Sequence, residues 1–554
     1  MTYIDVYILL SHEPHGSTFS FKTKPFAHEH LLMSTIAVSS DATEKKTGWE
    51  LMKVIFASSL GTLIEWYDFY IYGALAPIIA KQFFPAENPT AAFLAALATF
   101  AAGFVVRPFG ALVFGRLGDL VGRKYTFLVT LLLMGLSTFA IGFVPSYAQI
   151  GAAAPFIILA LRFIQGLALG GEYGGAATYV AEHSPLKRRG YFTSYIQTTA
   201  TLGLFLSLGV ILTTKSLAGD AAFNDWAWRV PFWASIIMII VSVYIRLRMA
   251  ESPLFSKIKH EGKISSNPLK ESFAKKPNLK LVLLALFGAV MGQGVVWYTG
   301  QFYAQTFIER TCSVEFVQTR YIILAAIAFG TGFFILFGWL SDKIGRKWIM
   351  LAGMFLAVVT YRPIYKAIYS IAGTKEKTEM TEKGSSGEAI ALNAATGDSV
   401  VTKTVVKAFT DGNTYKEVTK TTFGKDRSAK PKEEKVKTTW LSSGNFWLVA
   451  MLVLIQIIYV TMVYGPIAAF LVELFPTRIR YTSMSLPYHI GNGIFGGLTP
   501  LIATRLFDVS KTTTTPTGDP FVGLWYPIVI AAICFVIGAL YLPNKANEDR
   551  GEEE

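Results

Sequence analysis

The length, composition and charge of the chain restrict its class. Of its 554 residues, 52% are hydrophobic and only 16% are charged, and the mean hydropathy is +0.42, whereas soluble proteins carry about 25% charged residues. This composition excludes an ordinary soluble protein and predicts a chain embedded in a lipid bilayer, so the formal net charge of +13 needs an explanation other than a nucleic-acid partner.

Long apolar runs follow one another along the whole chain. Each is about 20 residues long, which is the length that crosses a bilayer as a helix. We expect twelve transmembrane helices, at 54–80, 92–114, 125–144, 153–181, 192–214, 228–247, 280–308, 320–340, 348–370, 444–472, 482–507 and 523–542. The predicted fold class is therefore an all-α membrane protein.

The basic residues lie mainly in alternate connections between these runs. They gather at 116–124, 187–189, 257–280, 343–347 and 478–480, while the intervening short loops hold few. Because Lys and Arg are enriched in cytoplasmic loops, we expect both termini in the cytoplasm. The positive charge thus indicates membrane topology and no nucleic-acid partner.

The first 50 residues are polar and mixed, without the pattern of a signal peptide. Met33 is a plausible alternative start, so we interpret residues 1–32 as an upstream extension of a cytoplasmic tail. Cys312 and Cys534 fall in an outer loop and in the last helix, and their positions predict neither a disulfide nor a metal site.

Two pairs of similar segments reveal an internal repeat. GRLGDLVGRK returns as GWLSDKIGRK, which places Asp119 and Asp342 223 residues apart; YVAEHSPLKRRG returns as FLVELFPTRIRY, which places Glu182 and Glu473 291 residues apart. The larger second offset indicates an insertion, which we place at 371–439. Two tandem six-helix bundles with a solute site at their interface are a transporter architecture.

The repeat sets the domain boundaries. We expect a cytoplasmic tail (1–50), a first bundle (51–250), a linker (251–278), a second bundle (279–544) and a short cytoplasmic tail (545–554). The insertion 371–439 falls on the outer side, and alternating residues on each side of Asp411-Gly412 are typical of a β-hairpin. We expect an external hairpin or a disordered flap. The ordinary alternative is an insertion without function, which a surface position tolerates.

Several motifs resemble a known family. The two Asp…Gly-Arg-Lys loops look like the loop signature of the major facilitator superfamily. GTLIEWYDFYIYG (61–73), RPFGALVFG (107–115), RFIQGLALGGEYGGA (162–176) and AESPLF (250–255) resemble its metabolite:proton symporter family. That family includes carriers of dicarboxylates such as 2-oxoglutarate, carriers of citrate and of shikimate, and carriers of the osmolytes proline and betaine. The likeness covers about 55–370 and 440–540, and the resemblance implies two pseudo-symmetric six-helix bundles.

Charged residues inside predicted spans are candidates for proton coupling, because such charges are expensive and usually functional. Glu65 and Asp68 lie in the first span, and Arg162 and Glu172 in the fourth. A carboxylate facing Arg stays ionised, and breaking the pair lets it take a proton. We expect Asp68 opposite Arg162 to be the proton switch, and the resemblance implies the same; the alternative is a static network that only fixes helix packing.

Polar and aromatic residues in other spans are candidates for binding the solute, because a few polar groups orient a ligand in an apolar pocket. Their ordinary alternative is helix packing. The predicted substrate-binding residues are Arg107, Gln165, Gln293, Trp297, Tyr298, Gln301 and His489.

The repeated loop residues are candidates for a gate. Acids and bases at the cytoplasmic helix ends can hold the two bundles together when the site faces outward, and opening inward must break these contacts. The predicted gating residues are Asp119, Arg123, Glu182, Arg189, Asp342, Arg346, Glu473 and Arg480.

No enzyme motif appears: the sequence has no phosphate-binding glycine loop, HExxH or nucleophile elbow. We therefore expect a transporter in the plasma (inner) membrane, working as a monomer without a cofactor and driven by the proton gradient. Its partners would be a small solute, protons and the lipid bilayer. The alternatives are facilitated diffusion, drug/proton exchange or a membrane sensor that transports nothing.

Overall fold

The computed structural model describes residues 48–85, 89–247, 251–374, 377–392, 399–423, 431–513 and 517–543. The expected extension 1–32 and the C-terminal tail 545–554 lie outside these ranges. The described chain is helical except for one sheet in the predicted insertion.

The first bundle contains the first six predicted spans. Its helices are α2 (Gly48–Phe83), α3 (Pro89–Val105), α4 (Arg107–Leu120), α5 (Arg123–Ile141), α6 (Tyr147–Ile150), α7 (Ala153–His183), α8 (Arg189–Gln197), α9 (Thr199–Asp225) and α10 (Val230–Leu247), with short 3-10 turns η1 (Leu186–Arg188) and η2 (Ala227–Arg229). One predicted span is divided into α3 and α4 at Val106. Pro108 lies in the first turn of α4, where its missing N–H breaks no helical hydrogen bond.

Two short helices, α11 (Pro253–His260) and α12 (Pro268–Phe273), connect the bundles. Ser252 caps α11 by accepting a hydrogen bond from the Phe255 amide, and Asn267 caps α12 in the same way through the Lys270 amide. Each helix begins with proline directly after its cap, which is the usual N-terminal pattern.

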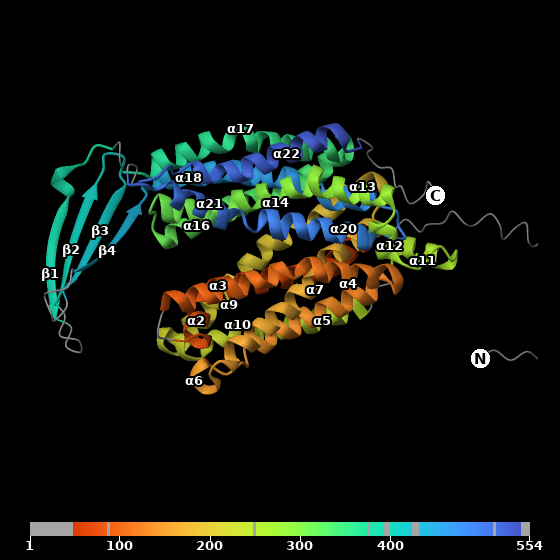
Figure 1. Cartoon of the computed structure of the whole chain (residues 1–554), viewed down its shortest axis with the longest axis horizontal. Coiled ribbons are helices and arrows are strands. Elements are labelled where there is room, and N and C mark those ends of the chain that lie inside the picture. The colour runs from red at the N-terminus through yellow and green to blue at the C-terminus, as the bar shows by residue number, and fades with distance from the viewer. Residues whose placement is uncertain are drawn as a thin grey trace, which may run out of the picture. The chain divides into compact units, whose positions relative to one another are not determined.

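The second bundle contains the remaining six predicted spans. It comprises α13 (Lys276–Ala285), η3 (Leu286–Val290), α14 (Met291–Tyr298), η4 (Thr299–Tyr303), α15 (Ala304–Thr306), η5 (Phe307–Thr311), α16 (Phe316–Ile344), α17 (Arg346–Ala372), α18 (Ser443–Tyr464), α19 (Ile467–Leu474), α20 (Arg480–His489), η7 (Ile490–Gly496), α21 (Thr499–Ser510), η8 (Val522–Leu524) and α22 (Trp525–Tyr541). The turns η3, η4, η5 and η7 are π-helical. Figure 1 shows the two bundles side by side, the first in red to yellow and the second in green to blue.

The prediction of twelve spans is confirmed. Within the described ranges, nine helical stretches are long and apolar enough to cross a membrane. The other three predicted spans correspond to α2, to α3 with α4, and to α20 with η7 and α21. Large apolar side chains such as Phe109, Ile240, Phe329 and Leu540 are exposed, as expected of surfaces that face lipid.

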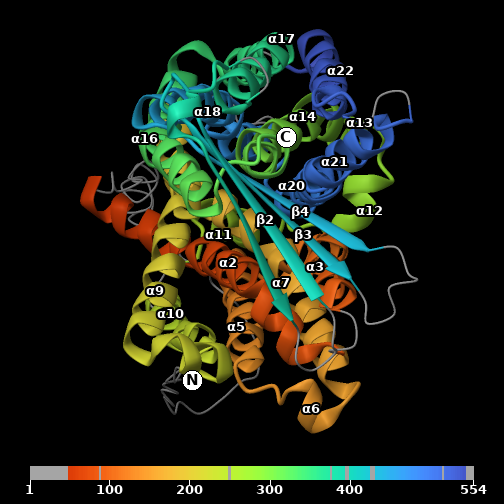
Figure 2. The ribbon, with the colours of Figure 1, turned by 90° about the vertical axis from the view of Figure 1, so that its left-hand side faces the viewer.

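The predicted hairpin is also confirmed, but it is part of a larger sheet. Strands β1 (Ser385–Leu392), β2 (Ser399–Ala408), β3 (Thr414–Phe423) and β4 (Lys432–Trp440), preceded by the turn η6 (Thr381–Lys383), form one antiparallel sheet in sequence order. Gly412 has φ +82° in the β2–β3 turn, a conformation that favours glycine. The strands extend beyond the helix ends of the second bundle (Figures 1 and 2).

The β2–β3 turn fixes the sheet to the second bundle. The Asn413 side chain donates to the Ile371 carbonyl at the end of α17 and accepts from the Ser442 amide before α18. Asp411 pairs with Lys377 at 2.6 Å and accepts from Asn445 in α18. Burial by itself raises the pKa of Asp411, but the hydrogen bonds of Lys377, the Asn413 amide and Asn445 outweigh it and hold that pKa below its usual value.

Candidate functional site

A small cavity of about 40 Å³ lies between the two bundles. In this measure a water molecule needs about 10–15 Å³, so the cavity holds only a few waters and must widen to admit a metabolite. Its lining comes from both bundles: Thr62, Glu65, Trp66, Phe104, Arg107, Tyr173, Ile196, Gln197, Trp297, Tyr298, Tyr464, Tyr488, His489, Asn492 and Gly493.

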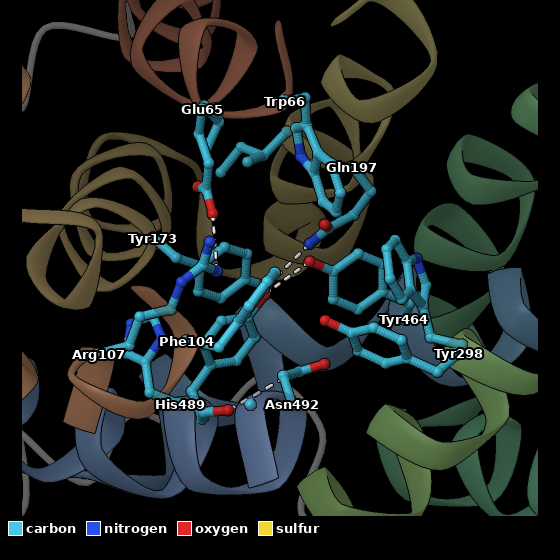
Figure 3. A pocket seen from close by; sticks show the side chains of 15 residues that line it. Glu65, Trp66, Phe104, Arg107, Tyr173, Gln197, Tyr298, Tyr464, His489 and Asn492 are labelled. Atoms are coloured by element: carbon cyan, nitrogen blue, oxygen red, sulfur yellow. Dashed lines mark hydrogen bonds and ion pairs between the residues drawn. The ribbon is translucent and has the colours of Figure 1, made fainter. Parts of the chain in front are cut away.

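An ion pair forms part of the first bundle's wall. Nη1 of Arg107, in the first turn of α4, donates to Oε1 of Glu65 in α2 at 3.1 Å. The guanidinium also lies 4.4 Å from the ring centre of Phe104, which holds it in place. Figure 3 shows the Glu65 and Arg107 side chains pointing toward each other.

A second ion pair lies deeper in the same bundle. Nη1 of Arg162 donates to Asp68 at 2.8 Å, and the Gln165 amide donates to the other oxygen of Asp68 at 3.2 Å. The Arg162 guanidinium is 3.6 Å from the ring centre of Tyr72. The predicted opposition of Asp68 and Arg162 is therefore present, although its role in proton coupling stays a prediction.

A smaller void of about 20 Å³ separates the two ion pairs. Both carboxylates, Glu65 and Asp68, and both arginines, Arg107 and Arg162, line it. Its size suits one water molecule, and its polar lining supplies hydrogen-bond partners. Glu65 and Arg107 line both this void and the central cavity, so the deeper pair lies directly behind them.

The second bundle contributes a neutral wall. Tyr488 in α20 stacks on Tyr173 of the first bundle at 3.7 Å between ring centres, and its hydroxyl lies 2.6 Å from that of Tyr464 in α18. Asn492 in η7 exchanges two 3.0 Å hydrogen bonds with Gln293 in α14. Among these groups, Figure 3 shows Tyr464 and Asn492 at the cavity.

The predicted substrate-binding residues separate into three groups. Arg107, Trp297, Tyr298 and His489 line the cavity, as does Glu65. Gln165 lines the void between the ion pairs. The third group, Gln293 and Gln301, is buried in α14 and η4 outside both linings.

Glu172 lies away from the cavity. Its carboxylate accepts from Arg246 in α10 at 2.9 Å and from the Thr130 hydroxyl in α5 at 3.0 Å. Glu172 and its two partners belong to the first bundle, and Glu172 lines neither the cavity nor the smaller void. This environment favours a role in packing, and its predicted part in proton coupling stays a prediction.

Sequence reasoning missed six polar lining residues: Thr62, Tyr173, Gln197, Tyr464, Tyr488 and Asn492. Helical spacing held a partial signal, since Asn492 follows His489 by three residues and therefore lies on a neighbouring face. Tyr173 and Gln197 are joined by a 2.8 Å hydrogen bond between α7 and α8, a contact that no sequence pattern indicates.

The predicted gating residues hold the bundles together at the loop end. The Asp119 carboxylate accepts from the backbone amides of Tyr481 at 3.3 Å and Thr482 at 2.8 Å. Arg123 pairs with Asp119 at 3.2 Å and donates to the Thr477 carbonyl at 2.8 Å. Residues of the first repeated loop thus contact the second bundle directly.

The other members of the repeat make matching contacts. Glu182 pairs with Arg480 of the second bundle at 3.0 Å. Asp342 accepts from the amides of Gly190 at 2.8 Å and Tyr191 at 2.7 Å in the first bundle.

Two gating residues make contacts inside their own bundle. Arg346 joins Asp342 and Glu473 within the second bundle, and Arg189 donates to the Ala181 carbonyl within the first.

The linker supports this end of the bundles. Ser252 donates to Glu182, Ser272 in α12 bonds with Ser483 at 2.8 Å, and Glu271 pairs with Arg478 at 2.9 Å. Burial by itself raises the pKa of Glu271, but its hydrogen bonds and nearby positive charges outweigh burial and hold that pKa below its usual value.

Aromatic side chains join the bundles around the cavity itself. Trp66 contacts Trp297 with 5.2 Å between ring centres, and Phe69, one helical turn beyond Glu65, contacts Phe302 at 5.5 Å. The loop-end contacts are also formed, so the bundles are joined at this end. Within the described residues, no cluster of three or more His, Cys, Asp or Glu side chains could hold a metal ion.

Comparison with known proteins identifies the class. The family model described as "Sugar (and other) transporter" matches residues 53–281. The solved structure of the proton:xylose symporter XylE bound to 6-bromo-6-deoxy-D-glucose superposes with a TM-score of 0.61 at 16% identity, covering 91% of this chain and 98% of that one. The fold and the cavity between its bundles therefore define a membrane transporter of the major facilitator fold.

Curated relatives narrow the class further. The inner membrane metabolite transport protein YhjE of Escherichia coli is 33% identical over 460 residues, covering 82% of this chain and 87% of the relative. The proline/betaine transporter of Salmonella typhimurium is 28% identical, covering 88% and 83%, and the shikimate transporter of Escherichia coli is 31% identical, covering 57% and 72%. The chain belongs to the major facilitator superfamily and, within it, to the metabolite:proton symporter family. It is a multi-pass membrane transporter of small solutes and not an enzyme.

Proposed function

We propose that the protein is a proton-coupled symporter that moves a small organic acid or polar osmolyte by alternating access. The observation that carries this proposal is the buried Asp68–Arg162 pair, whose atoms lie 2.8 Å apart and whose side chains are 3% and 5% exposed. Charges inside a membrane span are costly and normally functional. A carboxylate separated from its cation in such surroundings is more stable when it is protonated.

The contacts between the bundles support alternating access. Aromatic contacts join the bundles around the cavity, and polar contacts such as Glu182–Arg480 join them at the loop end. Opening the loop end must break these polar contacts, whereas the Asp68–Arg162 pair lies within one bundle and survives the motion. Gate and proton switch are therefore separate elements of one cycle.

The charge pattern supports an orientation. We place both termini and the linker 251–278 in the cytoplasm and the sheet of the insertion 371–439 outside, in the plasma (inner) membrane. The cavity, both ion pairs and the gate belong to one chain, so a monomer suffices and no nucleic acid takes part.

The test uses the full chain in proteoliposomes with an imposed inward proton gradient. Internal pH and radiolabelled uptake are followed while shikimate, benzoate, proline, betaine, 2-oxoglutarate and citrate are added in turn. We expect one compound to acidify the lumen and accumulate, and Asp68→Asn to abolish uphill accumulation while exchange counterflow persists. Glu309→Gln, which removes the partly exposed Glu309–Arg320 pair at the helix ends, is the matched control.

Three results contradict the proposal. Uptake that never exceeds equilibrium indicates facilitated diffusion, and lumen alkalinisation indicates proton exchange. Full accumulation by a folded Asp68→Asn variant removes Asp68 from the coupling mechanism.

A further inference from the structure

The Glu65–Arg107 pair lies where solute and proton can meet. Its side chains are 11% and 16% exposed and line the central cavity, whereas Asp68 and Arg162 lie behind them at 3% and 5%. A solute in the cavity therefore reaches Arg107 before it reaches the deeper pair.

Arg107 is the counterion on which Glu65 depends. The charged or titratable groups near Glu65 come from six helices: Asp68 (α2), Arg107 (α4), Arg162, Glu172 and Tyr173 (α7), Tyr298 (α14), Tyr464 (α18), and Tyr488 and His489 (α20). Asp68 is paired with Arg162 and Glu172 with Arg246. Without Arg107, Glu65 would be a carboxylate without a counterion, close to other carboxylates in a low-dielectric site.

Arg107 is also prepared to receive a carboxylate. It is the only Lys or Arg among the described residues that line the central cavity. Its Nε is buried without a hydrogen-bond partner in the described part of the chain, while Nη1 contacts Glu65. A guanidinium binds a carboxylate through two parallel N–H donors, whereas Glu65 engages Nη1 alone, so a carboxylate that uses two donors is a better partner.

We propose that a solute carboxylate displaces Glu65 from Arg107 and that Glu65 then binds the transported proton, which it shares with Asp68 across the void between the two ion pairs. The proton comes from water on the side to which the cavity is open. It leaves Glu65 on the other side, when the departing solute lets Arg107 pair with Glu65 again. This inference rests on the proposed symport function and assigns its substrate class.

Charge balance identifies that class. Without solute, the cavity holds one cation, Arg107, and one anion, Glu65. When a carboxylate is bound and Glu65 is protonated, the net charge of the cavity is the same. The loaded carrier therefore changes conformation without an unpaired charge. A zwitterion would instead offer its ammonium to ionised Glu65 and need no proton there. A second carboxylate would face the neutral tyrosines and the Asn492 amide. The expected substrate is a small monocarboxylate anion whose remaining part is uncharged.

The test measures proton uptake on binding by the purified full chain in a weakly buffered solution. We expect shikimate or benzoate to bind with uptake of about one proton, and the affinity of the wild type to fall about tenfold per pH unit on the alkaline side. Glu65→Gln should bind the same acid without proton uptake and without that pH dependence. Arg107→Gln should not bind it, and methyl shikimate or methyl benzoate should not compete.

Other results overturn the inference in distinguishable ways. If Glu65→Gln still takes up the proton and Asp68→Asn does not, Glu65 is not the proton site, but the proposed symport function stands. If proline or betaine binds while both monocarboxylates fail, the substrate class is wrong. If no compound binds or is transported, the proposed function fails with it. Should Glu65→Gln not purify as a folded protein, pH-independent binding of the acid by the wild type is enough to overturn the inference.

Discussion

The two bundles supply different chemistry to the cavity that they share. The first bundle contributes ion pairs, Glu65–Arg107 at its wall and Asp68–Arg162 behind it. The second contributes neutral groups to the lining, chiefly tyrosines 298, 464 and 488 and the amide of Asn492.

This difference shows how one fold can separate switching from motion. Each ion pair near the cavity joins helices of the same bundle, so a relative movement of the bundles leaves it intact and only a proton or a solute can break it. The polar contacts that cross between the bundles at the loop end, such as Glu182–Arg480, do not line the cavity and can break without changing its charge. Three substitutions test this separation.

The largest expected effect concerns a charge of the first bundle that does not face the cavity. Glu172→Gln leaves Arg246 buried without its anion, and removing one partner of a buried pair costs about 3–5 kcal/mol. We expect a lower unfolding temperature in detergent, with solute-to-proton coupling unchanged in the protein that remains folded.

The double variant Glu172→Gln/Arg246→Gln is its control. It should recover much of the stability, because no uncompensated charge is left. Loss of coupling by a stably folded Glu172→Gln would instead make Glu172 part of the proton mechanism and end the distinction between packing and switching charges in the first bundle.

A moderate effect is expected in the second bundle. Gln293→Leu removes the two hydrogen bonds between Gln293 and the half-buried Asn492 amide and leaves only the bond that Asn492 donates to the Tyr488 carbonyl. Each lost hydrogen bond contributes about 0.5–1.5 kcal/mol, so we expect KM for the solute to rise about tenfold. The proton-to-solute ratio, measured from reversal potentials in proteoliposomes, should not change; a changed ratio would mean that the neutral wall also controls coupling.

The smallest effect on transport is expected in the sheet. Asp411→Asn weakens the attachment of the β2–β3 turn to Lys377 and α18, and hydrogen exchange of the turn amides should quicken while transport stays near that of the wild type. The pKa of Asp411 is lowered from 3.8. The difference in exchange between variant and wild type should therefore be full above pH 3.8 and disappear as the pH falls below that value.

A comparable loss of transport in Asp411→Asn would show that the sheet takes part in the cycle. A matched substitution, Lys407→Gln, removes the more exposed Lys407–Glu379 pair of the same sheet and should change neither the exchange of the turn nor transport.

Single residues show how far sequence reasoning reached into the site. Asp68 and Arg162 were paired correctly because few charges occur in spans and each must find a partner there. The partner of Glu65 was not assigned: Arg107 was considered as a partner of Asp68 or of an anionic solute, and the structure pairs it with Glu65. Arg246 was overlooked as the partner of Glu172 because it lies near the end of a span, where basic residues usually mark topology.

The amino-acid sequence by itself determined the number of spans, the tandem repeat, the position of the insertion and the family, because apolar run length, loop charge and repeated motifs are local properties of the chain. The tertiary structure decided which acid meets which arginine, which tyrosines line the cavity and that the insertion forms four strands. Those features depend on how helices distant in sequence rotate and pack against one another. A span lined by lipid on one side and protein on the other does not reveal from composition alone which of its faces meets the solute.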